Sequence, residues 1–126
     1  MKLTLETTNV NIIHAWEKDA IRVGDEWLRN HLIVAAERII RDWKPELPGK
    51  LGLADLNPAI GLAPEIILLG TGARLTIPNI ALMAEVAALG VGLEIMDTPA
   101  ACRTYNVLTH EGRNVVAALF VGQAEK

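Results

Sequence analysis

The sequence lacks a second cysteine, so the thiol of Cys102 has no partner for an internal disulfide. A lone cysteine is typical of a reducing compartment, and we expect a cytoplasmic protein. The N-terminus alternates polar and apolar residues and has no apolar core of the kind found in secretory signal peptides. No segment reaches the ~20 uninterrupted apolar residues of a membrane-spanning helix, so we expect no membrane span.

Positive charge is also scarce. The chain has 12 lysines and arginines against 15 acidic residues, and its net charge is −3. Because the basic residues are scattered, no basic surface is available for a phosphate backbone, and we expect no nucleic-acid binding. His14, His31 and His110 are isolated, and no pair has metal-ligand spacing such as HxxxH. We expect neither a metal site nor a cofactor.

The apolar content, by contrast, is sufficient for a compact domain. Hydrophobic residues make up 51% of the 126 residues, and no internal repeat or low-complexity tract is visible. A chain of this length can bury a core without disulfides or metals. We predict a single domain over 1–126, with a β-rich N-terminal layer (1–43), a connecting loop (44–63) and a core (64–122).

The N-terminal half has the pattern of short strands. Alternating stretches bounded by turn residues predict strands at 2–7, around 12–16 and on both sides of Gly24. Residues 31–43 fit either a helix or a hairpin that turns at Ala36 and Glu37, and the β-rich surroundings favour the hairpin.

Prolines and glycines then indicate a connecting loop at 44–58 with at most one helical turn. Trp16, Trp27 and Trp43 all lie before or at the edge of this loop. We interpret them as packing residues between layers rather than as a binding stack.

The C-terminal half alternates strands and helices. Apolar runs predict buried strands at 65–70, 91–97 and 114–122, and segments that begin near a proline and end at a glycine predict helices at 78–90 and 98–112. Helices of this length form crossovers between parallel strands, so the predicted order is β-α-β-α-β.

The first and last of these strands are apolar on both faces, so both faces of the sheet must be covered. If the three strands are neighbours in sequential order, right-handed crossovers place both helices on one face. The N-terminal half then covers the other face. The predicted fold class is α/β: a three-layer (β/β/α) single domain with a largely parallel central sheet.

Two loops are expected to leave this sheet at the same edge, where ligands of such folds bind. The first contains Gly70, Thr71 and Gly72. The glycines permit positive φ and close backbone approach to a ligand, and we expect the Thr71 hydroxyl and amide to be free. The GxG pattern is shorter than a dinucleotide fingerprint, and no P-loop lysine follows it.

The second loop begins a helix with Asp97, Thr98 and a proline. Thr98 is the expected N-cap, and the free first-turn amides would favour an anion. Arg103 and Asn106 share one helix face, so with the first loop they could hold a carboxylate or phosphate. The alternative is structural: Asp97 pairs with Arg103, and Thr98 serves only as a cap.

Cys102 also has two interpretations. Near a helix N-terminus and beside Arg103, a thiol can become a reactive thiolate. Small buried cysteines are, however, common core residues, and no second cysteine is present to resolve an oxidised form. The sequence favours the inert thiol.

The predicted helix at 78–90 carries Glu85 as its only charge. A helix that is apolar nearly all round is buried on more than one side. We therefore predict a protein partner or a second copy of the chain in contact with Leu82, Met83 and Val86.

The stretches LLGTG (68–72) and MDTPAACRTYNVL…EGRNVVAAL (96–119), with IRV at 21–23, resemble a family of small single-domain proteins. The family includes the mitochondrial NADH:ubiquinone oxidoreductase (complex I) assembly factor three, and its prokaryotic relatives are mostly catalogued as a domain of unknown function. The resemblance implies a compact α/β domain with a β layer on one side and two helices on the other. It matches Gly70, Thr71, Gly72, Asp97, Thr98, Arg103, Asn106, Glu111 and Gly112.

Two functions are consistent with these features. The first is a non-enzymatic interaction or assembly factor, connected by the resemblance to complex I biogenesis. The second is a small-anion or small-molecule site, binding or hydrolytic, at Gly70–Gly72, Asp97, Thr98 and Arg103. Because no catalytic dyad is visible, an enzyme is the less favoured interpretation.

Overall fold

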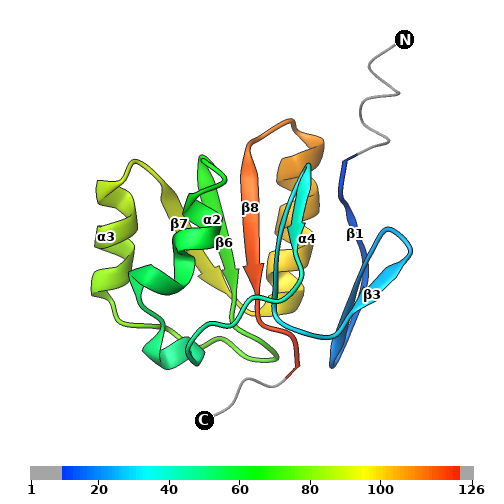
Figure 1. Ribbon diagram of the computed structural model, residues 1–126, viewed down its shortest axis with the longest axis horizontal. Helices are drawn as coiled ribbons and strands as arrows, with labels where there is room; N and C mark the ends of the chain where they lie inside the picture. The colour runs from blue at the N-terminus through cyan, green and yellow to red at the C-terminus, as the bar shows by residue number, and fades with distance from the viewer. Residues whose placement is uncertain (1–9, 123–126) are drawn as a thin grey trace.

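The computed structural model describes residues 10–122, so the strand predicted at 2–7 lies outside the described residues. The described chain forms a three-stranded antiparallel sheet and a five-stranded mixed sheet, together with helices (Figure 1). The small sheet consists of β1 (Ile13–Glu17), β2 (Ala20–Val23) and β3 (Glu26–Leu28). Gly24, with a φ of +61°, lies between β2 and β3, as the predicted turn requires.

The predicted hairpin at 31–43 is confirmed. Strands β4 (Leu32–Ala35) and β5 (Arg38–Ile40) pair antiparallel, with Ala36 and Glu37 in the turn. The hairpin does not belong to a separate N-terminal layer, because β4 also pairs antiparallel with the last strand, β8 (Val115–Leu119). The predicted layer of residues 1–43 is therefore divided between the two sheets.

The connecting segment contains more helix than predicted. It forms two 3₁₀ turns, η1 (Pro48–Lys50) and η2 (Leu53–Leu56), followed by the short helix α2 (Asn57–Ile60). The Asp55 carboxylate accepts a hydrogen bond from the Gly52 amide at 2.9 Å, and the Trp43 indole N–H donates to the Asp55 carbonyl at 2.9 Å. Local side-chain capping and contact with Trp43 thus stabilise more helical turns than the single one that the proline and glycine content allowed.

The C-terminal order of strands and helices is as predicted. It comprises β6 (Ile66–Gly70), α3 (Ala81–Ala88), β7 (Gly92–Met96), α4 (Thr98–His110) and β8. The strand order of the large sheet is β5-β4-β8-β6-β7, and the β6–β7 and β6–β8 pairs are parallel. Because β4 and β5 are antiparallel to their neighbours, the sheet is mixed rather than largely parallel.

The two long helices lie on opposite faces of this sheet, so the prediction that both cover one face was wrong. Among the three parallel strands β6 is the middle one, with β7 on one side and β8 on the other. Two right-handed crossovers that run in opposite directions place their helices on opposite faces. In Figure 1, α3 lies at one end of the molecule beside β7, and α4 lies toward the other end, next to β1.

Each face of the sheet has its own core, as the doubly apolar strands predicted. The first core packs α4 and the small sheet against one face, through residues that include Ile13, Ile21, Leu68, Ala117 and Tyr105. The second core packs α3 and the connecting segment against the other face, through Leu56, Leu69, Leu82, Val86 and Ala118 among others.

The tryptophans follow the packing prediction only in part. Trp43 is buried in the second core, and its ring meets Phe120 edge-on at a centroid distance of 5.3 Å. Trp16 is half-buried and packs against the first core. Trp27 is 40% exposed on β3, so it does not pack between layers.

Candidate functional site

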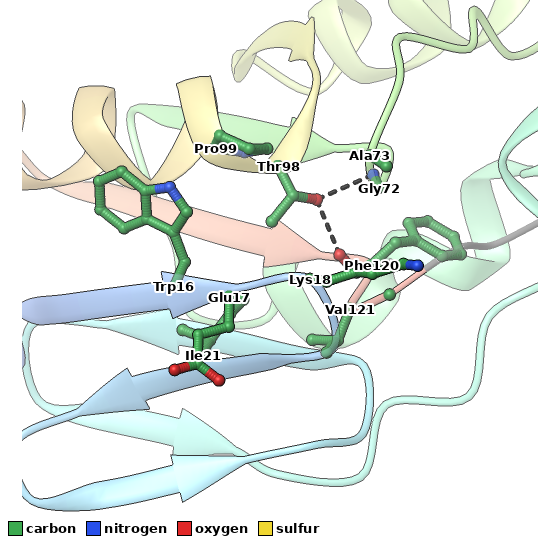
Figure 2. A pocket seen from close by; sticks show the side chains of 11 residues that line it. Trp16, Glu17, Lys18, Ile21, Gly72, Ala73, Thr98, Pro99, Phe120 and Val121 are labelled. Atoms are coloured by element: carbon green, nitrogen blue, oxygen red, sulfur yellow. Dashed lines mark hydrogen bonds between the residues drawn. The ribbon is translucent and has the colours of Figure 1, made fainter.

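The loops that follow β6 and β7 meet at one edge of the large sheet, where Thr98 connects them. The Thr98 hydroxyl donates to the Phe120 carbonyl at 2.7 Å and accepts from the Gly72 amide at 2.8 Å. The Thr98 amide donates to the Gly72 carbonyl at 2.9 Å. These bonds join the loop after β6, the start of α4 and the end of β8, and Figure 2 shows the two hydroxyl contacts.

Gly70 is required by the close approach of the chain to itself. A Cβ at this position would lie 2.9 Å from the Thr98 hydroxyl oxygen and 3.0 Å from the Thr98 Cα. The Gly70 carbonyl accepts from the Phe120 amide at 2.9 Å. Of the two loop glycines, Gly72 alone adopts positive φ, at +103°.

Thr71 is not free, contrary to the prediction. Its side chain is 2% exposed, and its hydroxyl donates to the Arg74 carbonyl at 2.8 Å and accepts from the Thr76 amide at 3.0 Å. Its own amide donates to the Met96 carbonyl at 2.9 Å. The Thr71 polar groups therefore form hydrogen bonds within the chain and do not face a ligand.

The N-cap of α4 is Asp97, and the assignment of Thr98 to that role was wrong. The Asp97 carboxylate accepts from the Ala100 amide at 2.9 Å, and its carbonyl accepts from the Ala101 amide at 3.0 Å. With the Thr98 amide bonded to Gly72, the first-turn amides of α4 have partners within the chain. The N-terminus of α4 therefore has no free backbone amide with which to bind the predicted anion.

Arg103 and Asn106 do not form a shared binding site, because Arg103 is exposed and Asn106 is bonded to β1. Arg103 is exposed, and within residues 10–122 it forms no ion pair with Asp97. The Asn106 carboxamide accepts from the Ile13 amide at 3.0 Å and donates to the Ile13 carbonyl at 2.8 Å. Asn106 therefore connects α4 to β1. Further along, Glu111 is the C-cap of α4, and Gly112 ends the helix with a φ of +78°.

Cys102 is a buried core residue with no exposed surface. Burial raises the pKa of the Cys102 thiol to about 12, and the positive charge of Arg103 opposes this shift only in part. A thiol with this pKa is protonated at neutral pH and is a poor nucleophile. The geometry therefore agrees with the inert interpretation.

A pocket of about 260 Å³ opens beside the Thr98 junction. Its wall comes from four parts of the chain: the β1–β2 hairpin, the loop after β6, the start of α4 and the segment after β8 (Figure 2). The residues are Trp16, Glu17, Lys18, Ile21, Gly72, Ala73, Thr98, Pro99, Phe120, Val121 and Gly122. Gly72 and Thr98 were predicted site residues, whereas Asp97, Arg103 and Asn106 are not in its wall.

Sequence reasoning did not find the hairpin side of this pocket. Trp16 and Ile21 belong to the small sheet, and only the tertiary packing of that sheet against α4 brings them to the loop edge. Trp16 was a possible signal, since an aromatic residue near a strand end often lines a binding pocket.

A second feature is a group of exposed apolar side chains in α3 and in the segments directly before and after it. Leu82 and Val86 are buried in the second core, so of the three predicted contact residues only Met83, at 44% exposure, is available. Leu75, Ile77, Ile80 and Leu89 are also exposed, by 53% to 80%. We refer to these five exposed residues as the α3 surface.

The matching family extends over most of the chain. A family described as "Protein of unknown function (DUF498/DUF598)" matches residues 13–120. A "13 kDa major membrane protein" of Francisella tularensis subsp. holarctica is 28% identical over 88 residues, which are 68% of this chain and 72% of that protein. Within residues 10–122, none of the helices combines the length and hydrophobicity needed to cross a bilayer.

A shorter match connects the chain to human "NADH dehydrogenase (ubiquinone) 1 alpha subcomplex assembly factor 3". The two are 42% identical over 55 residues, which are 44% of this chain and 30% of the human protein. The matched part is thus less than a third of the length of that relative.

Solved structures of bacterial relatives have the same fold. A crystal structure from Bordetella parapertussis superimposes with a TM-score of 0.82 and 37% identity, covering 89% of this chain and 96% of that one. A solution structure from Bordetella pertussis, described as a Mth938-like domain, has a TM-score of 0.79 and 31% identity, with coverage of 93% and 90%.

Proposed function

Since this chain belongs to the DUF498/DUF598 family, and part of it is similar to a human assembly factor of NADH dehydrogenase, we propose that it is a non-catalytic assembly factor. In this role it binds a protein subunit of that complex before the complex is complete. The observation that carries the proposal is the α3 surface.

Large apolar side chains are concentrated in the α3 surface. Five of them are at least 44% exposed within the single segment 75–89. Isolated exposed apolar residues are ordinary on a folded protein, whereas groups of them mark contact surfaces. The segment also supplies only Leu82 and Val86 from α3 to the core, so most of that helix is available to a partner.

Charge favours a different protein over a second copy as the partner. Glu85 is exposed on α3, close in sequence to Met83, and the chain has a net charge of −3. A two-fold contact that covers Glu85 together with the α3 surface would place two carboxylates in the interface, and like charges in an interface oppose association. A subunit with an apolar patch and a basic residue opposite Glu85 fits this surface.

The reactive side chains of the described core support a role without catalysis. The Cys102 thiol is buried with a pKa of about 12. The Tyr105 hydroxyl donates to the Asn11 carbonyl at 2.8 Å, and burial raises its pKa to about 12. Both groups are protonated at neutral pH and enclosed by the fold.

The test is complementation of a strain that lacks the gene. Wild-type protein should restore assembled NADH dehydrogenase, measured on native gels and by NADH oxidation in membranes. Ile80→Glu and Met83→Glu should fail, because a buried carboxylate in the contact is costly. Val107→Glu is the matched control, since Val107 is 55% exposed on α4, on the other face of the sheet.

Protein levels and thermal unfolding of all three variants must equal those of the wild type. A deletion strain with normal NADH dehydrogenase, or full rescue by Ile80→Glu and Met83→Glu, would overturn the proposal.

A further inference from the structure

The pocket beside Thr98 is a separate feature of the molecule, and its chemistry differs from that of the α3 surface. We propose that it binds a small uncharged ring compound, held against the Trp16 indole. This site goes beyond the proposed assembly role and does not depend on it.

The pocket wall is held in place by the fold before any ligand arrives. Ile21 and Val121 are 1% and 8% exposed and belong to the first core. The Val121 amide donates to Nδ1 of His31 at 2.9 Å. The Thr98 hydroxyl bonds fix the loop at Gly72 to the end of β8. A preformed pocket avoids the entropic cost of ordering its wall on binding.

The lining is suited to an uncharged molecule. Its apolar residues include Ile21, Val121, Pro99 and Trp16. Glu17 and Lys18 supply the charges of the lining, and both are exposed to water. The Thr98 hydroxyl has its proton and one lone pair engaged within the chain. A ligand charge placed in the pocket away from Glu17 and Lys18 would therefore lose water without gaining a partner, which is unfavourable.

The size and the aromatic wall indicate a flat ring. The volume of about 260 Å³ lies just below the range of roughly 300–1,000 Å³ typical of small-molecule pockets, so the ligand has one or two rings. In Figure 2 the Trp16 indole lies on the α4 side, near Pro99, and Trp16 is one of the residues that line the pocket. Ring pairs add to the free energy of burial through offset or edge-to-face contact.

The direct test is a titration of the ¹⁵N-labelled protein with indole, followed by NMR. We expect saturable shifts of the Trp16 indole N–H and of the amides of Gly72, Thr98 and Gly122. Indole-3-carboxylate has the same ring with a charge, and it should bind at least about tenfold more weakly.

Two variants separate the pocket from general surface binding. Trp16→Ala should weaken indole binding by about tenfold, whereas Trp27→Ala, which removes an exposed indole from β3, should leave it unchanged. Ala73→Phe fills the pocket from its exposed rim without truncating the core, and it should abolish the shifts. Thermal unfolding of each variant establishes that it is folded.

The absence of saturable shifts with millimolar indole would overturn the proposal. So would shifts that persist in folded Ala73→Phe, or tighter binding of indole-3-carboxylate than of indole. None of these results bears on the α3 surface, so the two proposals fail independently.

Discussion

Asn106 on α4 pairs with the backbone of Ile13 on β1 as a neighbouring strand would. Its carboxamide accepts from the Ile13 amide at 3.0 Å and donates to the Ile13 carbonyl at 2.8 Å. The adjacent Tyr105 hydroxyl donates to the Asn11 carbonyl at 2.8 Å. Two consecutive residues of one helix thus fix the edge of the small sheet.

Replacing Asn106 by Ala should lower the free energy of unfolding by ~1–3 kcal/mol, because both Ile13 backbone groups lose their partner in a partly buried position. Urea denaturation followed by circular dichroism measures the change. Arg103→Ala on the exposed side of α4 is the control and should stay within about 0.5 kcal/mol of wild type. Equal effects of the two substitutions would contradict the role given to Asn106.

Gly70→Ala should destabilise the protein by about 1–3 kcal/mol, the usual range for overpacking in a closely packed site. The new Cβ would lie 2.9 Å from the Thr98 hydroxyl oxygen and 3.0 Å from the Thr98 Cα, and backbone cannot move away cheaply. Gly52→Ala is the control, since nothing lies within 4 Å of a Cβ there. Thermal and urea unfolding of both variants test the difference. If Gly70→Ala were as stable as the wild type, the contact between Gly70 and Thr98 would not be closely packed.

Lowering the pH below the ordinary pKa of histidine should destabilise the fold through His31. Burial lowers the pKa of His31, and its Nδ1 accepts from the Val121 amide at 2.9 Å, which requires the neutral ring. The group binds protons more readily when unfolded, so its contribution is complete above about pH 6.5 and is lost as the pH falls through the folded pKa.

The melting temperature of wild-type protein between pH 8 and pH 5 measures this effect. His31→Gln, which keeps an acceptor but does not titrate, should flatten the profile relative to wild type. An identical slope in His31→Gln would assign the pH dependence to other groups.

Cys102 should resist alkylation by iodoacetamide in the native protein. Its side chain is fully buried and its thiol has a pKa of about 12, so the thiolate is scarce and inaccessible at pH 8. Mass spectrometry should detect rapid labelling only after unfolding in urea. Labelling of the folded protein at the rate of a small free thiol would restore the reactive interpretation.

The local patterns of the sequence predicted the elements well because they depend on neighbouring residues. The hairpin at β4–β5 and the order β6-α3-β7-α4-β8 follow from alternation, prolines and glycines. The arrangement of these elements depends on distant pairings. The sequence does not reveal that β8 lies on the opposite side of β6 from β7, or that β4 pairs with β8. Both helices were therefore assigned to one face of the sheet.

The candidate site shows the same contrast between features that follow from neighbouring residues and features that depend on distant contacts. Gly72 and Thr98 were recognisable from their loop positions, and they do lie together. The roles of Thr71 and Asn106 were not, because their partners are Arg74 and Thr76 in one case and Ile13 in the other. Polar side chains in loops and helices are equally able to face a ligand or to bond to the backbone, and only the tertiary fold decides.

The position of β8 has a consequence for synthesis. Among the strands of residues 10–122 this one is made last, yet it lies between β4 and β6. In this part of the chain it alone connects the hairpin β4–β5 to the parallel strands β6 and β7. A ribosome-bound chain that has not yet released residues 115–119 can form the hairpin and the β6–β7 unit only as separate pieces. Closure of the large sheet therefore waits until β8 has left the ribosome, and a nonsense codon shortly before residue 115 would leave two sheet edges exposed to aggregation.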